Sequence, residues 1–540
     1  MLQNIVYLKR YRNSLSGYSS LPSEILLEIF HWCPKKREAA ADPCYAFSQV
    51  CHRWRSASIA DKTLWTTPDL LHPYLATKMY KNRTADLPLH IHMPDLFLWA
   101  RYDQKVVLKI PSGISERTQS IDLSYSRMGT DENPSAQPQR AIENFFHYSD
   151  CFPMLETLSL KSGDRHSRDT FYMGKDAPLL RSVTLENCLF SWTSSFLRNL
   201  TSLTIVLKHS VYTSNRYVAP NQPPILDVLR RNPNLETLVL KDVMCRAGLV
   251  APTPPTSNDI TPIEFAHMKS LEVSDDIHNI APLVPLLKVP LASKIRFRAN
   301  LGLTNSSNSY TRTLLEKLGR ALIKFLKLNR WTTKYRDITV LIDDNCSYAW
   351  LREKHGCGEM FDFHVSRPSN YYIDYARTWS EVLSTILLSG TPYINHAQCW
   401  RGEEARHTRM DYLCAGLAKL SALRTLEVFD QNSKPQIVED LLTTLEPRTP
   451  DDSDASQTFP ALKALNVKDI EMFKEASDSQ KESVFQKLNS VLERRKTAGE
   501  NIPGSIWLKE CSFIEPLEEV VLAASKNGIT TRNPRIIETK

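Results

Sequence analysis

The stretch Pro233-Asn234-Leu235-Glu236-Thr237-Leu238-Val239-Leu240 decides the fold of this chain. Its leucines follow the order apolar, two residues, apolar, one residue, apolar. Side chains of a strand alternate between two faces, so Leu238 and Leu240 lie on one face. The stretch therefore predicts a short strand that is buried on one side.

The same pattern recurs from residue 155 to residue 508, and several copies begin alike, as in Pro153-Met154-Leu155-Glu156-Thr157-Leu158. The first five copies begin at residues 155, 180, 200, 235 and 268, an irregular spacing that still falls within the range of solenoid repeats. The full set is Leu155/Leu158/Leu160, Leu180/Val183/Leu185, Leu200/Leu203/Ile205, Leu235/Leu238/Leu240, Met268/Leu271/Val273, Leu423/Leu426/Val428, Leu462/Leu465/Val467 and the weaker Pro503/Ile506/Leu508.

Helical patterns lie between these strands, with apolar residues at intervals of three and four. A strand, a crossover helix and a parallel strand, repeated, predict an α/β fold: an irregular leucine-rich-repeat-like solenoid with parallel strands and outer helices over residues 71–540. Leu87–Ile91 and Ser120–Leu123 are its expected opening strands, and residues 300–380 fit the period poorly. The expected helices are Ala141–Phe146, Ile225–Leu229, Leu314–Leu326, Trp379–Leu387, Tyr412–Leu420, Ile437–Leu445 and Val484–Leu492.

Composition sets limits on both fold and function. The chain has 540 residues, which is too long for one hydrophobic core and suits a repeat array. Only 16 residues are glycine, which argues against an enzyme built on several glycine-rich phosphate loops. The net charge of +7 permits an acidic partner without requiring nucleic acid.

The N-terminal region follows a different pattern. Residues 1–20 are expected to form an irregular, polar lead-in. Apolar residues at 25, 26, 29 and 30 then predict a helix that ends before Pro34, and Lys35–Pro43 reads as a charged loop. A second helical pattern runs from Phe47 to Trp54, and Leu64-Trp65 follow after a break. Residues 21–70 are therefore expected to form a small all-helical module.

Three segments of this module carry a resemblance: Leu21-Pro22-Ser23-Glu24-Ile25-Leu26-Leu27-Glu28-Ile29-Phe30, Ser48-Gln49-Val50-Cys51-His52-Arg53-Trp54-Arg55 and Asp61-Lys62-Thr63-Leu64-Trp65. Together they resemble an F-box. The repeats that follow resemble the degenerate leucine-rich repeats of F-box proteins from mushroom-type fungi. The chain departs from an orderly horseshoe in lacking a regular asparagine at the turns.

The resemblance implies a non-catalytic substrate receptor of an SCF-type (Skp–cullin–F-box) ubiquitin ligase. Its F-box would bind a Skp-type adaptor and so the cullin ligase core, and its repeats would hold a protein substrate. The residues expected to contact the adaptor, or to support that surface, are Leu21, Pro22, Ile25, Leu26, Ile29, Val50, Cys51, Trp54 and Trp65. The alternatives are that these side chains pack against the first repeat, and that the chain is a scaffold with no ligase attached.

Substrate contacts are expected on the strand residues that alternate with the leucines. A solvated sheet face with no binding role is the simpler interpretation of any one of them. The candidates are Thr157, Ser159, Lys161, Thr237, Lys241, Glu427 and Phe429.

Other chemistry has little support in the sequence. The eleven cysteines show no zinc-type pair, His407 beside Glu403 and Glu404 has no second histidine at i+4, and Gly356-Cys357-Gly358 lacks a phosphate-loop context. We therefore expect no enzyme activity, cofactor, metal or nucleic-acid partner, an unrecognised hydrolase being the remotest alternative. No membrane span is expected, and reduced cysteines favour a cytoplasmic or nuclear location. The acid-free start with Lys9 and Arg10 leaves a mitochondrial presequence as the alternative.

Overall fold

The computed structural model falls into two compact units. The first comprises Met1–Tyr217 with Asn221–Leu235, and the second comprises Val218–Pro220 with Glu236–Lys540. The structure describes residues 2–15, 17, 21–33, 43–68, 82–84, 86–93, 113–125, 146, 151–162, 169–171, 176–190, 194–207, 223–243, 261–301, 308–330, 337–342, 346–352, 360–366, 393–401, 411–418, 420–430, 436–446, 459, 461–468, 484–497, 503, 505–509, 512–513, 525, 529–532 and 535–536.

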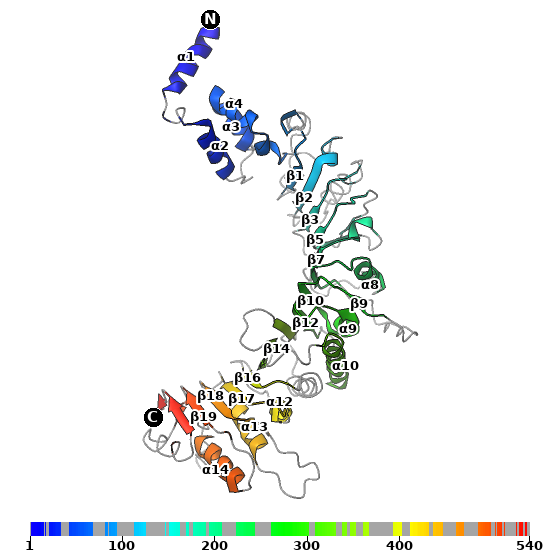
Figure 1. Ribbon diagram of the computed structural model, residues 1–540, viewed down its shortest axis with the longest axis vertical. Coiled ribbons are helices and arrows are strands. Elements are labelled where there is room, and N and C mark those ends of the chain that lie inside the picture. Colours follow the sequence, from blue (N-terminus) through cyan, green and yellow to red (C-terminus); the bar gives the residue numbers. More distant parts are fainter. Residues whose placement is uncertain are drawn as a thin grey trace, which may run out of the picture. The chain divides into compact units, whose positions relative to one another are not determined.

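The first unit begins with helices (Figure 1). They are α1 (Leu2–Ser14), α2 (Ser23–Trp32), α3 (Pro43–Val50), α4 (His52–Ala60) and the short 3₁₀ helix η2 (Lys62–Trp65). Two expectations were wrong here. The lead-in contains a 13-residue helix, α1. The single helix expected over Phe47–Trp54 is two helices that break at Cys51, whose φ of −156° is extended.

Parallel strands follow in the first unit, in the order β1-β2-β3-β5-β7. They are β1 (Leu89–Met93), β2 (Thr118–Tyr125), β3 (Thr157–Ser162), β5 (Ser182–Glu186) and β7 (Ser202–Val206). In β3, β5 and β7 the leucine pattern fills alternate buried positions, as the sequence predicted. Smaller elements are η3 (Ser115–Arg117), β4 (Asp169–Phe171), β6 (Cys188–Phe190), η4 (Ser195–Leu197) and α8 (Pro223–Arg230).

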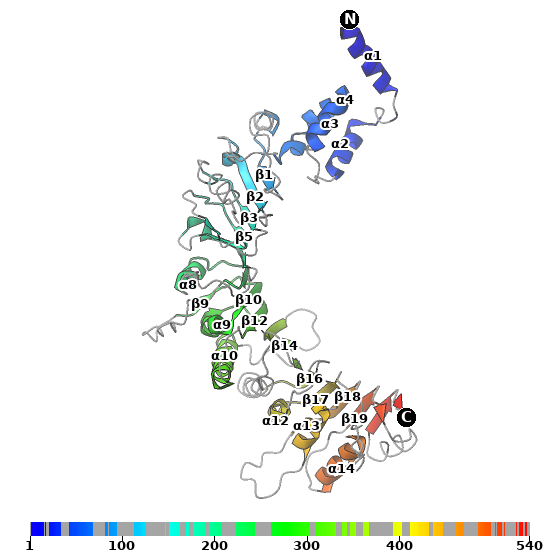
Figure 2. The ribbon, with the colours of Figure 1, turned by 180° about the vertical axis from the view of Figure 1, so that it is seen from behind.

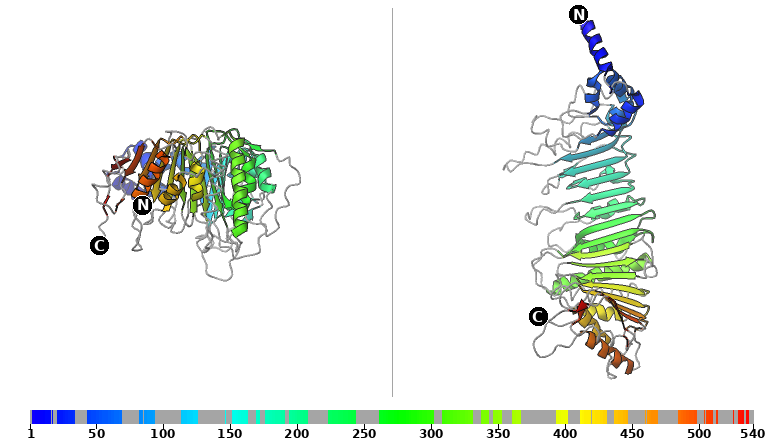
Figure 3. Two further views of the ribbon diagram at one scale, coloured as in Figure 1. Left: turned by 90° about the horizontal axis from the view of Figure 1, so that it is seen from below. Right: turned by 90° about the vertical axis from the view of Figure 1, so that its left-hand side faces the viewer.

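The second unit holds a longer, mostly parallel sheet, seen from its edge and from its face in Figure 3. Its strand order is β8-β10-β12-β15-β14-β13-β16-β17-β18-β19-β21. The bounds are β8 (Thr237–Lys241), β10 (Ser270–Asp276), β12 (Lys294–Asn300), β13 (Asp337–Ile342), β14 (Cys346–Arg352), β15 (Met360–Ser366), β16 (His396–Arg401), β17 (Thr425–Asp430), β18 (Ala464–Lys468), β19 (Ser505–Lys509) and β21 (Ile529–Arg532).

The loss of period over residues 300–380 has a structural cause. Strand β14 pairs antiparallel with both β13 and β15, so this part of the sheet is a meander and not a series of strand–helix repeats. Three consecutive strands replace the strand and crossover helix of a parallel unit. The expected strand at Ile338/Val340/Ile342 is β13.

Helices of the second unit lie along one side of its sheet (Figure 2). Helix α9 contacts β10 and β12, α13 contacts β17, and α12, α13 and α14 pack in succession. The elements are α9 (Ile277–Leu283), η5 (Val284–Leu286), α10 (Asn308–Leu328), α12 (Asp411–Ala418), α13 (Gln436–Leu445) and α14 (Val484–Thr497), with short strands β9 (Ile263–Glu264), β11 (Leu287–Lys288), β20 (Ser512–Phe513) and β22 (Arg535–Ile536).

The structure confirms most of the helices that the sequence predicted. Helices α8, α10, α12, α13 and α14 lie where the spacing predicted them. The expected helix Trp379–Leu387 lies outside the described residues, as does Ala141–Phe146 except for the buried Phe146. The structure describes a parallel-strand sheet that follows an N-terminal set of helices, which is the broad α/β architecture expected.

Two buried asparagines join helices to the turns before strands, a feature that the sequence analysis missed. Asn232 Oδ1 accepts the Leu200 N–H at 2.8 Å, while Nδ2 donates to the carbonyls of Leu197 at 2.9 Å and Val228 at 2.7 Å. Asn329 does the same with the Val289 N–H and the Leu287 and Phe325 carbonyls. Each amide therefore satisfies three backbone groups away from water.

We expect Asn232→Ala to destabilise the first unit by about 2–4 kcal/mol, because it leaves three buried backbone groups without a partner. Asn234→Ala is the matched control, since Asn234 is exposed only two residues away and should change stability by less than about 0.5 kcal/mol. Pulse proteolysis in a urea series measures both values. Equal stability of the two variants would contradict this role of Asn232.

Candidate partner-binding surface

The helical module is held together by a small aromatic core. Leu26 and Phe30 of α2 are buried together with Leu64 and Trp65 of η2 and with Ala57 of α4. The Phe30 ring stacks on Phe47, with ring centroids 4.3 Å apart. Trp54 packs edge-on against Phe30 at 5.1 Å. Such pairs add to the stability that area burial alone supplies.

Trp65 is the largest side chain of this core and is fully buried. Its Nε1 donates to the Ser58 carbonyl at 2.6 Å, so its one polar group is satisfied inside the module. The Arg83 guanidinium lies 4.1 Å from the centre of a Trp65 ring. Trp65 therefore joins η2 to α4 and to the segment that leads into β1.

Polar contacts fix the ends of these helices. Asp61 accepts hydrogen bonds from the Thr63 hydroxyl at 2.6 Å and the Thr63 N–H at 2.9 Å, and it lies 2.9 Å from His31 Nε2. Burial raises the pKa of Asp61, but the hydrogen bonds from Thr63 and His31 outweigh it, and the pKa is lowered overall. Asp61 thus holds the end of α2 against η2.

Helix α2 carries a second apolar face that the module does not cover. Ile25, Ile29 and Trp32 recur at i, i+4 and i+7 and form a stripe, here called the docking stripe. Their exposed fractions are 48%, 39% and 79%. Val50 at the end of α3 is also exposed. Three large apolar side chains on one exposed helix face make this a candidate partner-binding surface.

The structure separates the nine predicted adaptor residues into three groups. Ile25, Ile29 and Val50 are exposed and able to contact a partner. Leu26 and Trp65 are core residues, so they support the surface without contacting a partner in this arrangement. In the third group, Leu21 packs on the core, and its carbonyl accepts a hydrogen bond from Arg53. Pro22 is the exposed N-cap of α2, and Cys51 caps α4 because its Sγ accepts the Trp54 N–H. Trp54 itself is part of the aromatic core.

Trp32 was missed by the sequence analysis, although its position seven residues after Ile25 was the available signal. Its indole Nε1 donates to the Glu28 carboxylate at 3.4 Å, one turn earlier, and the residue stays 79% exposed. Phe30 and Leu64, which also belong to the segments that resemble an F-box, pack inside the module.

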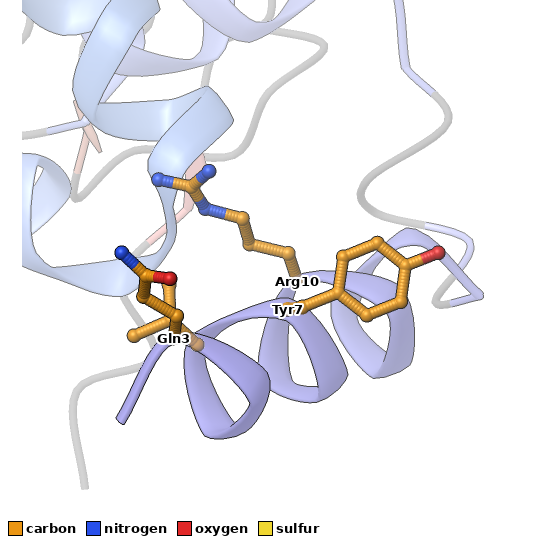
Figure 4. A pocket seen from close by; sticks show the side chains of 4 residues that line it. Gln3, Tyr7 and Arg10 are labelled. Carbon is orange, nitrogen blue, oxygen red and sulfur yellow. The ribbon is translucent and has the colours of Figure 1, made fainter. Parts of the chain in front are cut away.

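A shallow hollow lies along α1 and is lined by Gln3, Val6, Tyr7 and Arg10 (Figure 4). All four residues come from one helix, and Tyr7 and Val6 are 68% and 45% exposed. The hollow therefore offers no enclosed cavity for a small ligand. We assign no binding role to this hollow.

In the first unit, the three substrate candidates lie on β3, with Thr157 exposed and Ser159 and Lys161 half-buried. They alternate with buried leucines, as predicted. Lys161 Nζ lies 3.7 Å from Asp122 on the neighbouring strand β2. Asp122 also lies 2.9 Å from His92 Nδ1 on β1. The Lys161–Asp122 contact is an exposed ion pair, which contributes little to stability.

In the second unit, Glu427 is the centre of a polar cluster across three strands. Its carboxylate accepts hydrogen bonds from Gln398, Asn466 and Lys468, each at 3.0 Å. Burial raises the pKa of Glu427, but the hydrogen bonds from Lys468 and Asn466 outweigh it, and the pKa is lowered overall. Lys241, by contrast, pairs with Glu272 of β10 at 3.0 Å, and Thr237 is half-buried at the start of β8.

Phe429 is buried, although the sequence predicted an exposed side chain. It lies on the predicted face of β17 but is only 6% exposed. The Trp400 ring of β16 stacks on it at 3.8 Å, and Lys468 Nζ of β18 lies 5.0 Å from the Phe429 ring centre on the other neighbouring strand. The two aromatic rings form a platform with Trp400 as its more open member.

The Glu427 cluster predicts a pH dependence. Because the folded-state pKa of Glu427 is below its ordinary value of 4.5, its stabilising contribution is complete above that pH and is lost as the pH falls through the folded-state pKa. Glu427→Gln should therefore lower the thermal midpoint at about pH 7 more than at about pH 3. Differential scanning calorimetry at the two pH values checks this, and a difference that grows on acidification would contradict it.

Other site types find no support in the part of the chain that the structure describes. No group of three or more His, Cys, Asp or Glu is placed to hold a metal ion there. No described helix has the length and apolar character needed to cross a bilayer. Burial raises the pKa of the Cys399 thiol to about 12, so this buried cysteine is a packing residue and not a nucleophile. His407 and Cys357 lie outside the described residues.

Comparison with known families assigns the helical module. Residues 18–71 match the model of the F-box-like family, and they include α2, α3, α4 and η2. The module is thus an F-box-like domain, which suggests a chain that binds the adaptor of an SCF-type ligase. No curated protein matches the chain.

Proposed function

We propose that this chain is a substrate receptor of an SCF-type ubiquitin ligase and binds a Skp-type adaptor through the docking stripe of α2. The observation that carries the proposal is the exposure of Ile25, Ile29 and Trp32 on the helix that begins the F-box-like domain. A module of about 45 residues has little core to spare, and apolar residues exposed at this spacing favour a helix-binding partner.

The strands and helices after residue 70 are proposed to form an irregular leucine-rich-repeat-like solenoid, of the kind that fungal F-box proteins carry. Strands with one buried face, the leucine pattern and the helices along one side support this assignment. The uncovered face of the strands is proposed to hold the protein to be ubiquitinated, with Thr157, Ser159, Lys161, Thr237, Lys241 and Glu427 among its contacts.

In this proposal the chain performs no chemistry itself. A receptor acts by holding the target near a charged conjugating enzyme, which raises the effective concentration of the target's lysines. The cullin core joins through the adaptor, and the cytoplasm or nucleus is the proposed location. A reducing compartment suits the buried thiols Cys188, Cys399 and Cys414.

Co-expression with a Skp-type adaptor tests the proposal. The full chain should elute with the adaptor as one complex in size-exclusion chromatography, and adding the cullin core should extend that complex. A well-folded chain that elutes apart from the adaptor would overturn the proposal and would favour a scaffold that works without a ligase.

A further inference from the structure

Helix α10 has two sides of opposite character. Its inner side is apolar, with Leu315, Leu318, Leu322 and Phe325 buried. This side packs against α9, η5 and β11, and the Phe325 ring lies 5.3 Å from the Phe297 ring of β12, centroid to centroid. Figure 2 shows α10 on the helix side of the second unit's sheet. Its outer side is exposed and basic.

Four cations form a line along that outer side, here called the basic stripe. They are Lys317, Arg320, Lys324 and Lys327, and all four are exposed. Intervals of three, four and three residues keep them on one face of the helix. At about 1.5 Å of rise per residue, the basic stripe is roughly 15 Å long. Ile323 and Leu328 flank it and are half-buried, so they add apolar surface on both sides.

The basic stripe is not neutralised within the part of the chain that the structure describes. No carboxylate of a described residue forms an ion pair with any of its four cations. The one acid of α10, Glu316, pairs with Arg312 at 3.1 Å. The flanking elements α9, η5 and β11 contain no aspartate or glutamate.

The sequence concentrates positive charge around α10. Residues 277–336 contain twelve lysines and arginines and one acid, Glu316, whereas the whole chain has a net charge of only +7. Elsewhere in this stretch, Arg296 pairs with Asp362 at 2.8 Å and Lys288 with Glu264 at 2.8 Å. The basic stripe keeps its full charge by contrast, so a partner that binds there is acidic.

The spacing of the basic stripe favours one kind of acidic partner. A second α-helix beside α10 rises by the same distance per residue, so carboxylates at intervals of three, four and three residues would each lie opposite a cation. A membrane surface fits less well, because a helix bound there needs large apolar anchors, and none of the exposed large apolar side chains of the described residues lies on α10. A nucleic acid also fits less well, because no exposed residue of 312–330 offers an aromatic ring on which a base could stack.

We infer that the basic stripe of α10 docks an acidic α-helix of a partner protein, with glutamate or aspartate at intervals of three, four and three residues. Ion pairs along the stripe would set the register of the partner helix, and Ile323 and Leu328 would pack against its apolar side chains. The basic stripe lies on the helix side of the sheet, opposite the strand face proposed for the ubiquitinated protein. The inference therefore goes beyond the proposed function and does not depend on it.

The test uses the full chain and two fluorescent peptides of about 20 residues, each held helical by a hydrocarbon staple because short isolated helices are marginal in water. One peptide carries four glutamates at intervals of three, four and three residues. The other has the same composition with its glutamates spread around the helix. Binding is followed by anisotropy at about 0.05 M salt, where screening is weak. We expect the aligned peptide to bind at least fivefold more tightly than the redistributed one.

Variants of the chain locate the binding site. Arg320→Glu/Lys324→Glu should raise the Kd of the aligned peptide at least tenfold, and the neutral Arg320→Gln/Lys324→Gln should give a smaller loss. Arg320→Lys/Lys324→Arg keeps the charge and should stay within twofold of the wild type. The matched control is Lys463→Glu/Lys496→Glu, the same two reversals at exposed positions of the second unit, which should also stay within twofold. The thermal midpoint of each variant verifies its fold.

Three results would overturn the inference. The first is equal binding of the two peptides, which would reduce the effect to net charge. The second is an equal loss in Arg320→Glu/Lys324→Glu and Lys463→Glu/Lys496→Glu. The third is binding of an oligothymidine of the same charge, or of phosphatidylserine vesicles, that is as tight as binding of the aligned peptide. Adaptor binding plays no part in the assay, so its result is independent of the receptor function.

Discussion

The double variant Ile25→Asp/Ile29→Asp is expected to lose binding to a Skp-type adaptor by at least 100-fold without unfolding. Both side chains are exposed on α2 and contribute nothing to the core formed by Leu26, Phe30 and Trp65. Two carboxylates placed at the centre of an apolar interface lose their hydration with no partner, a cost of several kcal/mol. Each 1.4 kcal/mol corresponds to a tenfold change in Kd.

The measurement is biolayer interferometry with immobilised adaptor, together with circular dichroism to verify the fold. Leu291→Asp/Tyr393→Asp is the matched control, because it places the same two charges at exposed apolar positions of the second unit. That control should bind as the wild type does. If Ile25→Asp/Ile29→Asp bound the adaptor as tightly as the wild type, the docking stripe would not be the adaptor-binding surface.

Trp65→Ala is expected to unfold the F-box-like domain. Trp65 is fully buried, and its loss removes a large ring and its hydrogen bond to Ser58, at a cost of about 3–5 kcal/mol. A module this small has little more than that to lose. Adaptor binding should disappear as well, through loss of structure and not through loss of a contact.

Trp32→Ala distinguishes loss of structure from loss of an adaptor contact, because it removes the same kind of ring from a position that is 79% exposed. We expect it to leave the domain folded and to weaken adaptor binding. Hydrogen–deuterium exchange of α2 and α4 measures the fold of the domain in each variant. Fast exchange in Trp32→Ala, or full protection in Trp65→Ala, would reverse the assignment of which tryptophan lies in the core.

Local pattern was sufficient to predict the strands that carry the leucine signature, but not strands such as β12, β15 and β16, which lack it. Leu238 and Leu240, like Leu465 and Val467, alternate with polar residues within one strand, and the structure buries them as expected. The helical module was also predicted from the apolar spacing of its own residues, and its resemblance to an F-box agrees with the family match over residues 18–71. What these predictions share is that the information lies within a few residues of the chain.

Contacts between distant residues were not predictable in the same way. Phe429 was expected to be open, and only the pairing of β16 with β17 reveals that Trp400 covers it. Asn232 shows no local sign that its amide satisfies three backbone groups. The antiparallel β14 follows from strand pairing that the leucine pattern does not encode. Each of these depends on how segments distant in sequence come together, which only the three-dimensional fold determines.

Site-specific photocrosslinking tests the central claim most directly, that α2 contacts the adaptor through its exposed stripe. A photoreactive phenylalanine analogue replaces Trp32 in one sample and Leu291 in another, and each chain is irradiated with a Skp-type adaptor. We predict a covalent adduct with the adaptor from position 32 and none from position 291. An adaptor that binds the chain but crosslinks from neither position, or from position 291 alone, would contradict the account.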